Sequence, residues 1–180
     1  MVLWVTVPPM LEVLLKALRS AEGSICALLY CFDELEVCRV LSQKAREGVS
    51  VRIVIDRSQY RGPSCSTQYA RMIELLEWGV EMWTYSPPAG GFSVLHDKLW
   101  LVDAATLLTG SVNPTHNGFT NNEENLVRIR ESVSVSNAMN RFLEVLASAA
   151  PVDTLDVSRR AAAARERRDA RRSNSSAPLR

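Results

Sequence analysis

Short apolar segments alternate with amphipathic segments along the chain, and this alternation most restricts the fold that the sequence can adopt. Continuous apolar segments of this length are typical of strands buried on both faces of a sheet. The segment "SICALLYCF" has this character, and "VSVRIVID" and "VEMWTY" are predicted as the second and third strands. Between them, apolar residues recur three and four positions apart, which is the spacing of a helix that packs on one side. We therefore expect an α/β layer structure.

The amphipathic segments predict four helices, at residues 8–23, 33–48, 67–79 and 136–150. For the second helix, Asp33 is a candidate N-cap, because its carboxylate can accept a hydrogen bond from the first turn. Gly48 is a candidate C-cap, because glycine tolerates the left-handed backbone that ends many helices. The connecting segments 57–66 and 113–124 are expected to be loops.

The second half of the chain predicts a hairpin. "LHDKLWLVD" and "TLLTGS" are strand segments joined by a tight turn near residues 103–105, and "NLVRIR" follows as a further strand. Hairpin partners are antiparallel, whereas strands joined through a helix are usually parallel. The expected fold is accordingly a mixed β-sheet flanked by helices on both faces.

Charge divides the chain into two parts. Residues 1–156 carry 13 Lys and Arg against 18 Asp and Glu, a net charge of −5, whereas residues 157–180 carry eight Arg against two acids, a net charge of +6. We expect a compact domain over residues 1–150, followed over residues 151–180 by an Arg/Ala-rich basic tail that is partly helical or disordered. The tail shows no apolar face, so we expect it to be solvated and to be the part that contacts polyanions.

Cysteine usage and hydropathy point to a compartment. The four cysteines, at positions 26, 31, 38 and 65, form no CxxC pair and favour free thiols over a zinc site. Free thiols are typical of a reducing compartment. No apolar stretch reaches the roughly 20 residues that a membrane-spanning helix needs, so we expect an intracellular, soluble protein.

Polar side chains suited to phosphate chemistry lie on the two hairpin strands. His96 and Lys98 are two positions apart, so on a strand they face the same side, whereas Asp103 has the opposite parity. The next strand ends in "GSVN", where Ser111 and Asn113 are again two positions apart. If the strands pair, an imidazole, an ammonium, a hydroxyl and a carboxamide come together.

This set of groups suits a phosphodiester. An ammonium neutralises the non-bridging oxygens, and a hydroxyl and a carboxamide donate hydrogen bonds to them. Neutral His96 can attack phosphorus, and a carboxylate on its other ring nitrogen would orient it. The segment "NNEEN" offers Glu123 and Glu124 for that purpose, and Gly110 permits a close approach of the backbone.

The two segments together resemble the signature of the phospholipase D superfamily. "HDKLWLVD", six further residues and "GSVN" give HxK, four residues, Asp, six residues and GSxN, and "EENLV" is similar to the segment that follows in single-motif members. The resemblance covers roughly residues 10–147. It is nearest to the single-motif branch, which holds the Nuc-type endonucleases and the mitochondrial cardiolipin hydrolase/Zucchini group.

The resemblance implies a role for each matched residue. The implied catalytic residues are His96, Lys98, Asp103 and Glu124, and the implied phosphate-binding residues are Lys98, Ser111 and Asn113. His96 would form a phosphohistidine, and Glu124 would orient it, with Glu123 as the alternative one position away. Asp103 would be a supporting residue, in agreement with its strand parity. The family uses neither a metal nor a cofactor in this reaction.

One motif is half a site in this superfamily, because a second histidine must protonate the leaving oxygen and then activate water. The pattern occurs once in this chain, and His116 in "NPTHNGF" lacks the lysine spacing. The resemblance therefore implies a homodimer with the active site at its two-fold interface. Zucchini-type members also carry a membrane anchor and a zinc-binding insert that this chain does not show. The mitochondrial surface is thus a location that the resemblance alone suggests.

Three functions remain open. The first is an endonuclease acting on single-stranded nucleic acid, for which Tyr60, Phe92 and Phe119 could stack bases, unless these loop aromatics are half-buried. The second is a phospholipase hydrolysing cardiolipin or another phosphatidyl ester, with the basic tail on anionic lipid. The third is a non-catalytic dimeric binding module, which the intact His96 and Lys98 disfavour.

Overall fold

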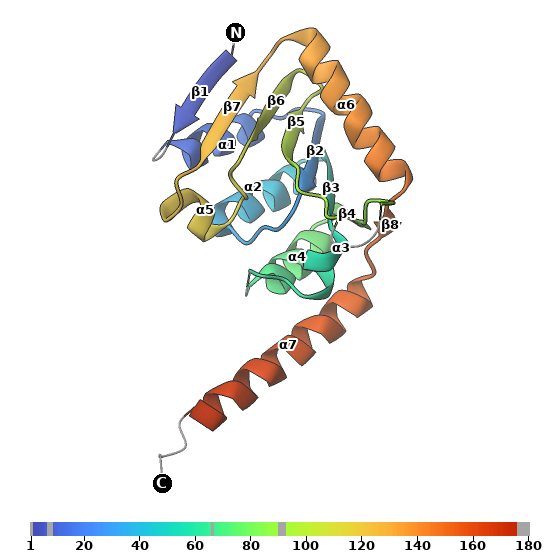
Figure 1. Cartoon of the computed structure of the whole chain (residues 1–180). Coiled ribbons are helices and arrows are strands. Elements are labelled where there is room, and N and C mark those ends of the chain that lie inside the picture. The colour runs from blue at the N-terminus through green and yellow to red at the C-terminus, as the bar shows by residue number, and fades with distance from the viewer. Residues whose placement is uncertain (1, 7–8, 66, 90–92, 176–180) are drawn as a thin grey trace.

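A computed structural model describes residues 2–6, 9–65, 67–89 and 93–175 of the protein. Its strands are β1 (Val2–Thr6), β2 (Ser24–Leu29), β3 (Ser50–Asp56), β4 (Glu81–Tyr85), β5 (Lys98–Val102), β6 (Thr106–Gly110), β7 (Asn125–Ile129) and β8 (Ala150–Pro151). They form one eight-stranded sheet in the order β1-β7-β6-β5-β2-β3-β4-β8 (Figure 1). Strands β2, β3 and β4 are parallel, and the other pairs are antiparallel, so the expected mixed sheet is confirmed.

Helices cover both faces of the sheet, as expected. They are α1 (Met10–Arg19), α2 (Leu35–Arg46), α3 (Arg57–Arg61), α4 (Gln68–Glu77), α5 (His116–Thr120), α6 (Ser132–Ala147) and α7 (Thr154–Ser175). Apolar side chains of α1, α2 and α4 pack on one face in a single buried cluster. Helix α6 packs on the other face, where Phe142 joins Leu28, Leu99 and Leu101. Within the described ranges, no helix has the length and apolar character needed to cross a membrane.

Several local expectations differ from the structure. The segments expected as loops contain the short helices α3 and α5, and strands β1 and β8 were not expected. Both strands pair with partners distant in sequence, β7 and β4, which local periodicity cannot reveal. The expected strand at residues 95–103 is β5 alone, so His96 precedes the strand instead of belonging to it.

The N-cap expected for α2 is wrong, and its C-cap is Glu47, one residue before the expected Gly48. Glu34 is the N-cap, and its carboxylate accepts a hydrogen bond from the N–H of Glu36. Asp33 instead accepts hydrogen bonds from the backbone N–H of His116 and the hydroxyl of Thr67, two long-range contacts that competed with capping. Gly48 follows the C-cap residue and has a φ of 90°, in the left-handed region.

The basic tail forms a helix that packs on the body for part of its length. Residues 154–175 are helical, and residues 176–180 lie outside the described residues. The expectation of a solvated tail without an apolar face is wrong for the first turns of α7. Val157 is fully buried, and Ala161 and Ala164 pack against the core next to α4. Two of these three side chains are methyl groups, which give only a weak apolar pattern.

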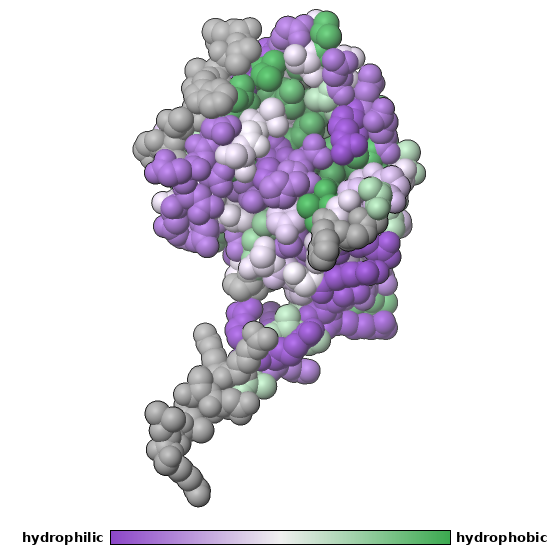
Figure 2. Space-filling view, in the orientation of Figure 1, coloured by the Kyte–Doolittle hydropathy of each residue, from purple (hydrophilic) through white to green (hydrophobic). Residues whose placement is uncertain are grey.

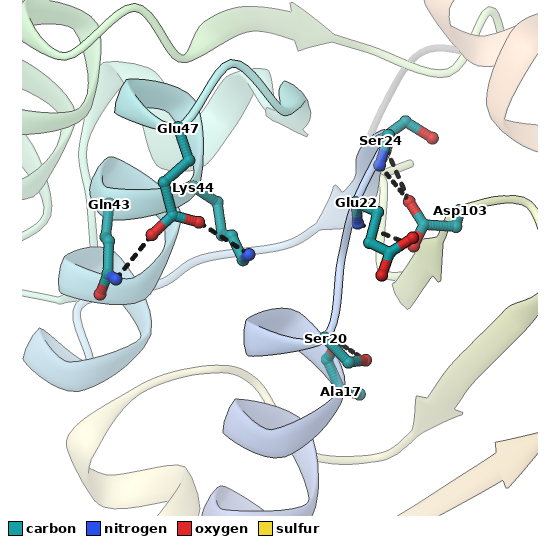
Figure 3. A network of polar contacts seen from close by, with 9 residues as sticks. Ala17, Ser20, Glu22, Ser24, Gln43, Lys44, Glu47 and Asp103 are labelled. Atoms are coloured by element: carbon teal, nitrogen blue, oxygen red, sulfur yellow. Dashed lines mark hydrogen bonds and ion pairs between the residues drawn. The ribbon is translucent and has the colours of Figure 1, made fainter.

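Asp103 fastens the hairpin to the turn that precedes the central strand β2 (Figure 3). Its Oδ1 accepts hydrogen bonds from the backbone N–H of Gly23 at 2.8 Å and Ser24 at 2.9 Å, and its Oδ2 accepts one from Glu22 at 3.0 Å. Burial raises the pKa of Asp103, but these three hydrogen bonds, together with the charge of Lys44, outweigh burial and hold the pKa below its usual value.

Replacing Asp103 with alanine should lower the free energy of unfolding by about 1–3 kcal/mol, because the N–H groups lose their acceptors. Since the folded pKa is depressed, the carboxylate stabilises the fold above the unfolded pKa of about 3.9, and this stabilisation is lost as the pH falls through the folded pKa. Urea denaturation at pH 7 and pH 3 measures both effects. Asp97→Ala, which removes a surface ion pair with Arg141, should cost no more than about 1 kcal/mol. Equal losses in the two variants would contradict the anchoring role of Asp103.

Candidate active site

Strand pairing brings the candidate residues from both hairpin strands to one edge of the sheet. In the antiparallel pair of β2 and β5, Leu29 lies opposite Lys98, so the carboxyl end of β2 meets the amino end of β5. In the pair of β5 and β6, Leu99 lies opposite Thr109, so β6 ends beside Lys98 as well. Asp103 follows the opposite end of β5 and does not reach this edge.

His96 lies exposed at this edge, with its imidazole against the ring of Tyr30. The ring centroids are 4.9 Å apart and the planes meet at 62°, an edge-to-face contact. Partial burial of the imidazole and the charge of Lys98 lower the pKa of His96. The carboxylates of Asp56 and Asp97 counteract only part of this effect. The imidazole is therefore neutral at pH 7, the state in which a ring nitrogen can act as a nucleophile.

Lys98 is buried, with 5% of its surface exposed, and holds the backbone at His96. Its Nζ donates a hydrogen bond to the carbonyl oxygen of His96 at 2.9 Å and lies 5.5 Å from the centre of the Tyr30 ring. Burial lowers the pKa of Lys98, whereas Cys31 and Glu124 raise it. In the described part of the chain, no carboxylate forms a salt bridge with Lys98, so its charge can interact with a bound anion.

Although His96 precedes the strand, it shares the side of Lys98, because both contact Tyr30. Asp97, between them, points to the other layer and pairs with Arg141 of α6 at 3.3 Å. Side chains therefore alternate between the two faces from His96 onward, although His96 itself lies before the hydrogen-bonded part of β5.

Ser111 and Glu124 are linked to each other. The Ser111 hydroxyl donates to the carboxylate of Glu124 and accepts a hydrogen bond from the backbone N–H of Asn125 at 3.0 Å. Glu124 also accepts from the side-chain amide of Asn122 at 3.2 Å. Among the described residues, neither glutamate at 123 or 124 is hydrogen-bonded to His96, so the structure of one chain joins Glu124 to the hydroxyl and not to the imidazole.

Asn113 begins a loop that is fixed to the start of α2. The carbonyl of Pro114 accepts hydrogen bonds from the N–H groups of Asp33 and Glu34, both at 3.1 Å, which accommodates the proline after "GSVN". The Asn113 Oδ1 is buried and has no hydrogen-bond partner. Asn113 lines a cavity of about 470 Å³. The other residues of this cavity are Cys31, Asp33, Ser64, Cys65, Thr115, His116 and Asn117.

His116 belongs to this cavity but is largely exposed. Its side chain is 72% exposed, and its Nδ1 lies 3.8 Å from a carboxylate oxygen of Glu34. Of the aromatic residues considered for base stacking, Tyr60 and Phe119 are buried in the core and cannot stack on a base. Phe92 lies outside the described residues.

Three residues that the sequence reasoning missed support the site. Asp56, 1% exposed, accepts hydrogen bonds from the N–H of Leu95 at 2.8 Å and from the N–H groups that begin α3. Gln59 donates to the hydroxyl of Tyr30 at 2.7 Å. A polar residue at the end of the apolar segment "VSVRIVID" was a usable signal for Asp56, whereas Tyr30 lies inside an apolar segment that gave none.

The four cysteines are free, as expected. A hydrogen bond from Cys65 lowers the pKa of Cys31, and the same contact raises the pKa of Cys65. Within the described residues, no group of three or more His, Cys, Asp or Glu side chains is placed to hold a metal ion.

Gly110→Ala should disrupt the site and lower stability by about 1–3 kcal/mol, because a Cβ at this position would lie 2.2 Å from the carbonyl oxygen of Asn125. The resulting shift of the strand end displaces Ser111, so hydrolysis of a phosphodiester should also fall. Thermal unfolding and an activity assay measure the two effects. Gly62→Ala, where a Cβ meets nothing within 4 Å, is the matched control and should leave stability unchanged. Wild-type behaviour of Gly110→Ala would show that this close approach is not needed.

Comparison with known proteins relates this arrangement to a family. Residues 14–146 match the family described as "Cardiolipin synthase, PLD-like domain". "Mitochondrial cardiolipin hydrolase" from Homo sapiens is 31% identical over 115 residues, which cover 63% of this chain and 42% of that protein. "Phospholipase D" from Rickettsia prowazekii is 25% identical over 118 residues, which cover 66% of this chain and 53% of that protein. The chain thus spans about half the length of the curated relatives that it matches.

Solved structures share the fold over most of the chain. Nuc from Salmonella typhimurium, a phospholipase D family member, aligns with a TM-score of 0.75 and 27% identity, covering 84% of this chain and 97% of that one. NucT from Helicobacter pylori aligns with a TM-score of 0.73 at 18% identity, which supports the fold alone. From the family match and the structural likeness to Nuc, the chain belongs to the phospholipase D superfamily, in its single-motif branch.

Proposed function

We propose that the protein is a metal-independent phosphodiesterase that works through a phosphohistidine on His96 and cleaves single-stranded nucleic acid. One observation supports this proposal above the others. The neutral imidazole of His96 and the buried ammonium of Lys98 lie at the edge of the sheet where β6 ends and Ser111 and Asn113 follow. A buried cation without a carboxylate partner, beside a neutral nucleophile, suits attack on an anionic phosphodiester.

In the first step, a ring nitrogen of His96 attacks phosphorus and the bond from phosphorus to the leaving oxygen breaks. Lys98 keeps two N–H donors beyond the one bound to the His96 carbonyl, and these stabilise the charge on the non-bridging oxygens. The side-chain amide of Asn113 donates a further hydrogen bond to the same oxygens. Ser111 has one O–H donor, which Glu124 accepts in this structure, so Ser111 donates to the phosphate only when Glu124 moves away. Water then attacks phosphorus, the phosphorus–nitrogen bond breaks, and His96 is regenerated.

A second histidine has to protonate the leaving oxygen and later accept the proton of the attacking water. We propose that it is His96 of a second copy of the chain, in a homodimer whose two-fold axis passes through the site. The exposure of His96 at the open edge of the sheet supports this arrangement. His116 is the alternative within one chain, since it lines the same cavity as Asn113.

The supporting carboxylates have different proposed roles. Glu124 accepts a hydrogen bond from the Ser111 hydroxyl and adds negative charge near Lys98. To orient His96, Glu124 would have to move from its present position. Asp103 acts only through the fold, since its hydrogen bonds go to the turn before β2.

The cavity favours nucleic acid over phospholipid as the substrate. Its lining beside Asn113 is mainly polar, with Asp33, Ser64 and His116 among its residues, whereas an acyl chain needs apolar surface. The names of the relatives, which include both Nuc and cardiolipin hydrolase, agree with either substrate. A non-catalytic binding module would not need the neutral nucleophile and buried lysine to be retained.

Purified protein should hydrolyse bis(p-nitrophenyl) phosphate in excess EDTA, and His96→Asn should abolish this activity because it removes the nucleophile. Asp97→Asn, whose side chain faces α6, is the matched control and should retain most activity. Activity that survives in His96→Asn, or that disappears with EDTA, would contradict the metal-independent phosphohistidine mechanism. Single-stranded RNA, single-stranded DNA and cardiolipin vesicles offered side by side identify the substrate class.

The shared site predicts that activity per chain falls on dilution as the dimer dissociates, in parallel with the dimer fraction measured by analytical ultracentrifugation. Monomers with full activity would contradict the shared site and favour His116 as the second histidine.

A further inference from the structure

A groove lined by arginines lies where α7 meets the body of the protein. It has a volume of about 310 Å³ and is formed by the end of α3, the loop that follows it, α4 and α7. We call it the basic groove and define it by Arg61, Tyr69, Arg167 and Arg168. A second hollow of about 180 Å³, next to it, is lined by Arg165 and again by Arg168. Guanidinium groups from two separate elements thus face a common concave surface.

The groove is held in place by specific contacts of the first turns of α7. Asp156 accepts hydrogen bonds from the hydroxyl of Tyr60 and, at 2.7 Å, from the Nε of Arg160. The Arg160 guanidinium also lies 4.8 Å from the centre of the Tyr60 ring. With Val157 buried beneath, these contacts fix the direction in which α7 leaves the body (Figure 1). The arginines that follow therefore have defined positions beside α4.

The charges of the groove differ in how far they are neutralised. Arg160 is paired with Asp156 and has little attraction left for a ligand. Among the described residues, Arg167 donates a hydrogen bond only to the carbonyl of Ala163 in its own helix, at 3.0 Å. Neither Arg167 nor Arg61 takes part in a salt bridge within the described ranges, and both are exposed. Figure 2 shows hydrophilic side chains over the surface where α7 joins the body. The groove is therefore a local positive site on a body whose net charge is −5.

One loop separates the basic groove from the candidate active site. Gly62 and Pro63 line the groove, and Ser64, the next residue, lines the cavity that contains Asn113. The loop is tied to the catalytic edge, because the N–H and hydroxyl of Ser64 donate to the side-chain oxygen of Gln59 at 2.9 and 2.8 Å. Gln59 in turn donates to Tyr30, which contacts the His96 ring.

We propose that the basic groove binds the phosphate backbone of single-stranded nucleic acid, several nucleotides away from the phosphodiester that is cleaved. This inference rests on the proposed function and adds to it the site that positions a polymeric substrate. Guanidinium groups bind phosphate oxygens in pairs of hydrogen bonds, and a concave site admits a flexible strand. A lipid surface is a poorer match, since the side chains of α7 at 157, 161 and 164 are packed against the body, which leaves Leu155 as the one exposed large apolar side chain among the described side chains of α7.

The test uses full-length His96→Asn protein, which is expected to bind substrate without cleaving it. Fluorescence anisotropy measures its affinity for labelled single-stranded DNA of about 4 and about 16 nucleotides, over a range of salt concentrations. Arg61→Gln with Arg167→Gln removes two charges and keeps the side-chain stems. The matched control, Arg39→Gln with Arg46→Gln, removes two charges from α2.

The groove variant should bind the longer DNA at least roughly tenfold more weakly, with a salt dependence reduced by about two ion equivalents. Its affinity for the short DNA should not change, and neither should hydrolysis of bis(p-nitrophenyl) phosphate when His96 is restored. The control should bind both DNAs as the parent does. Thermal unfolding verifies that both variants are folded.

Unchanged affinity of the groove variant for the longer DNA would overturn the inference, as would an equal loss in the control. A variant that loses binding to cardiolipin-containing vesicles but not to DNA would assign the groove to a lipid surface instead. These outcomes are distinct from failure of the proposed chemistry, which shows as wild-type protein that does not hydrolyse bis(p-nitrophenyl) phosphate.

Discussion

The site depends on the antiparallel pairing of β5 with both of its neighbours. Because Leu29 lies opposite Lys98, and Leu99 lies opposite Thr109, one register places the ends of three strands at a single edge. A slip by one residue would turn Lys98 to the layer of α6 and move the imidazole away from Tyr30. Asp103 secures this register from the other end of β5, where it is bound to the turn before β2. Asp103, which lies at the opposite end of β5, thereby belongs to the same sequence signature as the proposed nucleophile, His96.

Burial of one lysine sets the electrostatics of the edge. Lys98 is held by a backbone carbonyl and an aromatic ring, both weaker partners for a cation than a carboxylate. A carboxylate in contact with it would offset the charge that a phosphate needs, and the nearby Glu124 is occupied by the Ser111 hydroxyl. Burial of His96 and, second to it, the charge of Lys98 lower the pKa of His96, so the lysine proposed to attract the anion also helps to keep the proposed nucleophile unprotonated. Because the charge of Lys98 would act on both the bound phosphate and His96, phosphate binding and the reactivity of His96 would depend on the same lysine.

Periodicity and spacing predicted much of the fold and part of the site. Apolar segments gave the central strands, and the pattern from His96 to Asn113 identified the two strands that deliver polar groups. Contacts between distant segments could not be predicted this way. Tyr30 and Asp56 matter because β2 ends beside the amino end of β5 and β3 ends next to β2. The polar residue that ends an apolar segment marks Asp56, but nothing local to either residue identifies β5 as a neighbour. The capping error at Asp33 has the same origin, since His116 of α5 and Thr67, which precedes α4, donate hydrogen bonds to its carboxylate.

The opposite charges of body and tail matter for a polymeric substrate. Residues 1–156, with a net charge of −5, would repel a polyanion at most approaches, whereas the arginines of the basic groove would attract it locally. An attraction spread along a free tail would raise the local concentration of substrate without orienting it. The contacts of Asp156 and Val157 hold the first turns of α7 on the body, so a strand bound in the basic groove would meet the candidate active site in a limited number of registers. The packing of α7 would then select substrates by length, which the chemistry at His96 cannot do by itself.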